Sequence, residues 1–183
     1  MYTAAMTRYA AFLRGMNLGK RRITNEDLCA RFGALGLAGA TAFLASGNVV
    51  FAAEDGDPRR LGRRLEAGLR EALGYAVPIF LRTGEEVHAI AAHEPFPAAD
   101  VERSQSKVQV ALLAAEPAAA DRDAVLPLTP GDDRLAFAGR ELYWLPATGV
   151  GSSELDWKAV DRILGTVTIR TQRTLQRMAA KFF

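Results

Sequence analysis

The order of secondary-structure elements is clearest in the stretch "TAFLASGNVVFAAEDGDPRRLGRRLEAGLREALGYAVPIFLR", residues 41–82. Two apolar, β-rich runs flank Ser46-Gly47-Asn48, which predicts two strands joined by a tight turn. Residues 57–74 then read as a helix, and residues 75–82 as another strand, which Pro78 places at a sheet edge. This stretch therefore predicts the order strand, strand, helix, strand.

The helix in this stretch carries clear start and stop signals. Asp57 is a candidate N-cap, Pro58 occupies the first helical position, and Gly74 ends the helix. Its leucines recur every four residues and predict one apolar face; they are Leu61, Leu65, Leu69 and Leu73.

The elements that precede this stretch complete the pattern. An apolar strand at residues 8–14 and a helix at residues 24–36 precede it, so the order becomes βαββαβ, the ferredoxin-like unit. In the helix, Thr24 and Asp27 approximate a capping box and Gly36 is a natural stop. After a short helix opened by a Thr83 and Glu86 capping box, a loop-like linker follows.

The same order of elements then repeats without a clear residue-level repeat. It comprises strands at 107–114 and on both sides of Gly139, helices at 116–126 and 152–165, a strand at 166–170 and a final helix. We predict an α+β fold of two tandem ferredoxin-like halves packed as one unit, with a linking and a C-terminal helix. The expected segments are 1–82, 83–105 and 106–183.

Composition excludes several classes of protein. A hydrophobic fraction of 49% and a net charge of +2 suit a soluble globular chain and give no strong sign of a nucleic-acid binder. Cys29 is the one cysteine, so no internal disulfide forms. With no apolar run long enough to span a membrane and no signal-peptide pattern at the start, we expect a cytoplasmic protein.

The first candidate site is the edge where strand 8–14 ends. In a βαββαβ sheet the first and second strands are parallel, so their carboxyl ends lie together beside the start of the first helix. Donor-bearing and flexible residues collect there and predict an anion-binding loop. They are Arg14, Gly15, Asn17, Gly19, Lys20, Ser46, Gly47 and Asn48. Plain turn chemistry is the competing interpretation, and the equivalent edge of the second half is poor in donors.

Two weaker candidates lie in the second half. Gly149, Gly151 and Ser152 follow a strand and open a helix that Ser152 or Ser153 would cap, although an ordinary turn explains them as well. The last helix should dock an apolar face and present a basic face, which is more often solvated than functional. The basic residues are Arg173, Arg177 and Lys181.

Other chemistries lack a signature. "GMNLGKR" is one residue too short for a P-loop and has Arg21 where Ser or Thr is required. His88 and His93 have no partnering cysteine, so we expect no metal, and no cofactor is indicated. Cys29 within the first helix is typical of a small core residue rather than a nucleophile.

"LRGMNLGK", "FLASGNVVF", "GVGSS" and "LGTVTIRTQRTLQRM", in this order, resemble the bacterial family named domain of unknown function 1697. The resemblance covers nearly the whole chain, implies a duplicated ferredoxin-like fold and carries over no catalytic residues. It adds Thr168 and Arg170, which match the family's T-x-R. The chain departs at Thr171, Gln172 and Arg173, where the family has N-W-N.

Three hypotheses on function remain open. The first is a binding module for a small phosphate-bearing or nucleotide-like anion, or a nucleic-acid backbone, with Arg14 and Lys20 neutralising charge. The second is an enzyme on a phosphorylated or carboxylated molecule, with Glu26 or Asp27 as base. The third is a structural or oligomerising domain. We expect no membrane association, and either a monomer or a homodimer.

Overall fold

The structure is a computed structural model that describes residues 6–16, 22–37, 39–44, 47–54, 56–105 and 107–183. The chain divides into two compact units. The first comprises Met1–Val87 and Met178–Phe183, and the second comprises His88–Arg177.

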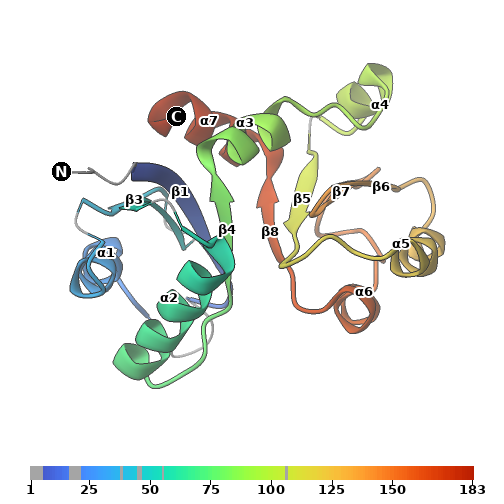
Figure 1. The fold of residues 1–183 in the computed structure, drawn as a ribbon. Coiled ribbons are helices and arrows are strands. Elements are labelled where there is room, and N and C mark those ends of the chain that lie inside the picture. The colour runs from blue at the N-terminus through green and yellow to red at the C-terminus, as the bar shows by residue number, and fades with distance from the viewer. Residues whose placement is uncertain (1–5, 17–21, 38, 45–46, 55, 106) are drawn as a thin grey trace. The chain divides into compact units, whose positions relative to one another are not determined.

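The first unit contains a four-stranded antiparallel sheet with the strand order β2-β3-β1-β4 (Figure 1). Strand β4 lies at the edge of this sheet, as Pro78 predicts. The elements follow one another along the chain as β1 Met6–Leu13, α1 Asn25–Ala34, β2 Thr41–Ala42, β3 Asn48–Glu54, α2 Pro58–Leu73 and β4 Ile79–Thr83.

Local signals in the sequence set the ends of both helices. Thr24 caps α1 by accepting a hydrogen bond from the Asp27 N–H, and Gly36 follows the helix with a φ of 83°. Asp57 caps α2 by accepting from the Arg59 N–H, and Gly74 ends it in the left-handed conformation. These four predictions are confirmed.

One face of the first sheet packs against both helices. The leucines of α2 lie on this face as predicted, with Leu65 and Leu69 buried and Leu61 and Leu73 packed against the core. Alternate residues of the strands point to the same side, as the two-residue period of a strand requires. The buried strand residues are Tyr9, Ala11, Leu13, Val49, Phe51, Ala53, Ile79 and Leu81.

The second unit also contains a four-stranded antiparallel sheet, with the order β6-β7-β5-β8. Its core includes Val125, Trp144 and Val160, and the Trp144 and Trp157 rings meet edge to face at 5.4 Å. Its elements are β5 Gln109–Leu112, α5 Ala119–Val125, the 3₁₀ turn η1 Leu126–Leu128, β6 Arg134–Ala138, β7 Glu141–Leu145, α6 Trp157–Leu164 and β8 Thr168–Thr171.

Three further helices complete the described chain: α3 Gly84–Ala92, α4 Ala98–Arg103 and α7 Gln172–Phe182. The predicted capping box of α3 is confirmed, because Glu86 accepts from the Thr83 N–H at 2.9 Å and Thr83 accepts from the Glu86 N–H at 3.2 Å. The prediction of a linker without structure is wrong in part, since α4 lies within it. Pro97 restricts the backbone just before this helix, where no N–H partner is needed.

The fold class is therefore α+β, as predicted, with two four-stranded antiparallel sheets and seven α-helices among the described residues. In each unit one face of the sheet packs against two helices, α1 and α2 in the first unit and α5 and α6 in the second. This arrangement brings loops that are distant in sequence to a common sheet edge, where the first candidate site is expected.

Candidate functional site

The end of β1 meets the β2–β3 connection, as the sequence predicts. The Leu13 N–H donates to the Gly47 carbonyl at 2.8 Å, and Phe12 pairs with Asn48 in the register. On the other side, the Arg14 N–H donates to the Pro78 carbonyl at 3.0 Å. The backbones of Arg14, Gly15, Gly47 and Asn48 therefore lie together at the end of the first sheet where β1 finishes and β3 begins. We call this the first edge.

Glycine at position 47 is required by conformation and by space. Its φ is 68°, in the left-handed region that costs other residues free energy. A Cβ atom there would lie 3.2 Å from both the Leu13 carbonyl oxygen and the Met16 Cγ. The close approach of the two connections thus depends on the absence of a side chain. Gly15 also has a positive φ, 74°.

Asn48 is fully buried and forms a bond inside the protein. Its Nδ2 donates to the Phe43 carbonyl at 3.0 Å, and the Phe43 N–H donates back to the Asn48 carbonyl at 2.8 Å. The side chain thus closes the turn between β2 and β3. This contact is the kind that a structural role predicts, whereas the half-buried Arg14 stands nearer the surface.

Four residues of the first candidate site lie outside the described residues: Asn17, Gly19, Lys20 and Ser46. Helix α1 follows the first three of these residues in the chain, and its first turn carries acidic side chains. The Thr24 hydroxyl donates to the Asp27 carboxylate at 2.7 Å, and Glu26 occupies the same turn. These acids reduce the attraction of this helix end for an anion. Asp27 is exposed and is hydrogen-bonded to Thr24.

The glycine-rich loop of the second unit is held by its own hydroxyls. Thr148 and Ser152 share a hydrogen bond of 3.0 Å, and Ser152 donates to the Gly149 carbonyl at 3.2 Å. Gly149 has a φ of 119°, and Gly151 is exposed.

The prediction that Ser152 or Ser153 caps the helix is wrong. Helix α6 begins at Trp157, and Asp156 caps it by accepting from the Lys158 and Ala159 N–H groups. Aspartate is as good an N-cap as serine, and here it stands one residue before the helix. Ser153 instead donates to the Asp133 carboxylate at 2.5 Å.

Asp133 organises this loop. Besides Ser153, its carboxylate accepts from the Trp144 indole N–H and from the Ala147 N–H, each at 2.8 Å. Three donors satisfy a half-buried carboxylate and fix the path of the chain after β7. Nothing in the sequence singles out Asp133, because its partners are spread over twenty positions and form no motif.

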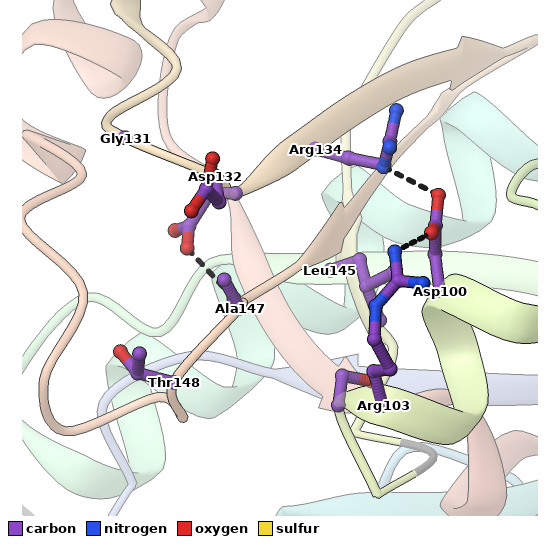
Figure 2. Close-up of a pocket in the computed structure, with 10 residues that line it drawn as sticks. Asp100, Arg103, Gly131, Asp132, Arg134, Leu145, Ala147 and Thr148 are labelled. Atoms are coloured by element: carbon purple, nitrogen blue, oxygen red, sulfur yellow. Dashed lines mark hydrogen bonds and ion pairs between the residues drawn. The ribbon is translucent and has the colours of Figure 1, made fainter.

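A cavity of about 610 Å³ opens beside Asp133. Figure 2 shows Arg103 and Arg134 both directed at Asp100. Asp132 lies across the close-up from these three residues. The Arg134 Nε lies 2.7 Å from the Asp100 carboxylate, and Arg103 pairs with the same group. Charges of both signs thus line one hollow, and Asp100 holds α4 against the start of β6.

Thr168 and Arg170 lie together on β8. Arg170 Nη1 donates to the Thr168 hydroxyl at 2.9 Å and to the Ile169 carbonyl at 2.8 Å. Burial lowers the pKa of Arg170 from its ordinary value to about 10. Above pH 10 the unfolded chain binds more protons at this residue than the folded chain does, so the cost of burying the charge declines as the pH rises through that value. At neutral pH this arginine is charged.

No cluster of metal ligands and no membrane-crossing helix occurs in the part of the chain that the structure describes. No three His, Cys, Asp or Glu residues in this part are grouped to hold a metal ion. Nor does this part contain a helix of the length and apolarity that a membrane span requires.

The sequence matches the family described as "Protein of unknown function (DUF1697)" over residues 6–143. The chain belongs to this family. The matched range runs from β1 to β7 and includes the first edge, whereas Gly149 and Arg170 lie beyond it. The resemblance drawn from the motifs is thus confirmed at the level of the family.

A solved structure shares the fold of this family member. It is the conserved bacterial protein SP0830 from Streptococcus pneumoniae, with a TM-score of 0.70 and 21% sequence identity. The likeness covers 96% of this chain and 98% of the other. At this identity it establishes the fold alone. No curated protein matches the chain.

At the position of the family's N-W-N, Gln172 has a structural role, and Gln176 on the same helix has a similar one. The Gln172 side chain donates to the His93 carbonyl at 2.6 Å, and the Gln176 side chain donates to the Ala91 carbonyl at 3.3 Å. Both glutamines thus satisfy carbonyls at the end of α3. Beside them lies a cavity of about 870 Å³, which Gln172 and Arg173 help to line. No motif in the sequence predicts this cavity.

Proposed function

We propose that this protein is a binding module for a small anionic ligand, phosphate-bearing or nucleotide-like, at the first edge. The observation that carries the proposal is the Leu13–Gly47 hydrogen bond of 2.8 Å, which joins the two donor-rich connections. Polar loops on a rigid sheet are common binding sites. The proposed contacts are Arg14, Gly15, Asn17, Gly19, Lys20, Ser46, Gly47 and Asn48.

The second unit supports this proposal by contrast. Ala114 follows Leu113 there, where Arg14 follows Leu13 in the first unit, and both leucines donate to the facing connection. A sheet edge of this shape thus does not itself require an arginine. The extra donors at the first edge call for another reason, and an anionic ligand supplies one.

Three alternatives involve the same edge. A structural role is favoured by Asn48, whose amide closes a turn. An enzyme would need a base, and Asp27 accepts from Thr24. A nucleic-acid backbone would be held by the same cations. The loop at Gly149, Gly151 and Ser152 and the pair Thr168 and Arg170 remain secondary proposals for binding.

The test is thermal unfolding of Arg14→Ala and of wild type with inorganic phosphate, nucleotides and sugar phosphates. Arg140→Ala, at the equivalent edge of the second unit, is the matched control. A ligand at about 100 times its Kd stabilises the folded state by roughly 2.7 kcal/mol. We expect a shift that Arg14→Ala loses and Arg140→Ala keeps, with both variants melting within a few degrees of wild type.

A collapse of the melting temperature in Arg14→Ala without ligand would assign this arginine to the fold. An absence of any shift with every anion would leave the structural alternative as the better account. Equal loss in both variants would show a general effect of charge and would contradict a site at the first edge.

We further propose that each half is ferredoxin-like, a reading supported by the order βαββαβ and by a sheet with the first and third strands at its centre. The proposed segments stay 1–82, 83–105 and 106–183. A cytoplasmic location is supported by the single cysteine, Cys29. Light scattering would show whether the protein is a monomer or a homodimer.

A further inference from the structure

Helix α2 presents a row of exposed arginines opposite its buried leucines. At 100° per residue these arginines fall within an arc of about 140°, and they extend for about 17 Å along the helix axis. We call this surface the α2 arginine face. It consists of Arg59, Arg60, Arg63, Arg64 and Arg70.

The arginine side chains of this face have no bonding partner among the residues that the structure describes. In the described residues, no ion pair or side-chain hydrogen bond involves any of the five. The acids of the helix do not neutralise them. Asp57 caps the helix, and Glu66 accepts the Ile79 N–H at 2.9 Å. Glu71 alone stands exposed at the far end.

The position of the face opposes the electrostatics of the helix. Helix N-termini favour acids, yet α2 has no acid in its first turn and four arginines in its first two turns. Neither local pairing nor the helix dipole therefore accounts for them. An anionic partner outside the protein would supply the missing compensation.

The equivalent helix of the second unit lacks this surface. Helix α6 follows β7 as α2 follows β3, and an aspartate caps each helix. Yet α6 carries Lys158 and Arg162 with Asp161 between them, so its charge is nearly balanced. Neither the fold nor a general excess of arginine in the chain explains the difference between two helices in the same place.

The shape of the face selects the kind of anion. Its straight length of about 17 Å matches about five phosphates along one strand of a duplex. An anionic membrane fits less well, because the apolar side of α2 is buried in the core and cannot enter a bilayer. The face has no aromatic side chain on which unpaired bases would stack.

We propose that the α2 arginine face binds the phosphate backbone of double-stranded nucleic acid without reading its sequence. Guanidinium groups suit phosphate oxygens because they donate in pairs. This surface is separate from the first edge, and the proposal does not depend on the ligand proposed there.

The test is fluorescence anisotropy with labelled 20-base-pair DNA and RNA duplexes between 50 and 200 mM salt. For B-DNA the logarithm of affinity should fall with the logarithm of salt with a slope of about −4.5 if all five arginines contact phosphates. The double variant Arg60→Gln, Arg64→Gln should reduce that slope by about 1.8 and weaken binding at least about tenfold.

Lys158→Gln with Arg162→Gln is the matched control. It removes two exposed cations at the same four-residue spacing from α6. This variant should bind within about twofold of wild type, and melting curves of both variants should match wild type. The Arg14→Ala variant should also bind the duplex normally.

Four results would overturn the proposal: no duplex binding at 50 mM salt, equal losses in the two double variants, tighter binding to single strands or phosphatidylserine vesicles than to duplex, or loss of duplex binding in Arg14→Ala. The last would move the nucleic-acid surface to the first edge. Failure of the small-anion test alone leaves the α2 result standing, so the two proposals fail separately.

Discussion

The two units form the same junction between strands with different side chains. In the first, Leu13 donates to the Gly47 carbonyl at 2.8 Å; in the second, Leu113 donates to the Arg140 carbonyl at 2.9 Å. The register agrees as well, because Asn48 pairs with Phe12 as Glu141 pairs with Leu112. The shared backbone bond belongs to the scaffold, so what differs around it is where specific function is to be sought.

The connections at this junction differ in length. Two residues, Gly139 and Arg140, separate β6 from β7, whereas residues 43–47 separate β2 from β3. Likewise residues 14–24 lead from β1 to α1, but only residues 113–118 lead from β5 to α5. Extra backbone on a common scaffold is typical of a functional loop. The first edge has it in both connections.

The last strands of the two sheets, in contrast, are alike in detail. Leu81-Arg82-Thr83 and Ile169-Arg170-Thr171 occupy equivalent positions, and each arginine donates from Nη1 to the preceding carbonyl at 2.8 Å. Each threonine also accepts from the N–H three residues on. This agreement is a residue-level repeat, because the two units form the same hydrogen bonds with the same residue types at equivalent positions.

The largest effect should follow from replacing Asn48 by Asp. The new carboxylate would face the Phe43 carbonyl in a fully buried site and lose the donor that binds it. We expect a loss of about 3 kcal/mol in the free energy of unfolding, measured with urea. Acid should recover part of it, because a protonated carboxyl can donate.

Glu141→Gln at the equivalent position of the second unit is the control for Asn48→Asp. It leaves an amide where the first unit already has one, and it should cost less than Asn48→Asp because it adds no charge to a buried site. Equal losses in the free energy of unfolding for the two variants would mean that the two junctions respond alike to a change of side chain. That result would contradict the difference inferred between the Asn48 and Glu141 positions.

A smaller effect should distinguish the two turns themselves. Gly47→Ala places a methyl group 3.2 Å from the Leu13 carbonyl and adds the cost of a left-handed alanine. We expect a loss of about 2 kcal/mol. Gly139 also has a positive φ, 55°, but a Cβ there meets nothing nearer than 3.6 Å. Gly139→Ala should therefore cost about 1 kcal/mol.

Calorimetry of both glycine variants checks this difference. If Gly139→Ala is as harmful as Gly47→Ala, the left-handed conformation accounts for both losses and the close approach at the first edge contributes nothing. A larger loss for Gly47→Ala measures the closeness of the two connections directly.

Periodicity and capping residues predicted the elements well, because those signals are local. The leucines of α2, its Asp57 cap and the Thr83–Glu86 box all lie within a few residues of their partners. The repeat at Arg82 and Arg170 escaped notice, since only the strand register aligns segments 88 positions apart. Asn48 had two interpretations in sequence, ligand contact or turn bond, and the structure shows the turn bond, because the Asn48 amide donates to the Phe43 carbonyl.

The smallest effect concerns the helix starts. Asp57 and Asp156 cap α2 and α6 with the same oxygen geometry, each accepting from the N–H two residues on at 2.9 Å. Replacement of either by Ala should cost about 1 kcal/mol. Ser152→Ala, which removes a loop hydroxyl and no cap, should change stability by less than about 0.5 kcal/mol. Urea unfolding of the three variants compares them, and a loss for Ser152→Ala equal to that for Asp156→Ala would contradict the assignment of the cap. Equal losses for the two aspartates would place the start of both helices in the shared scaffold, so that the arginines of α2 are a feature added to one copy of it.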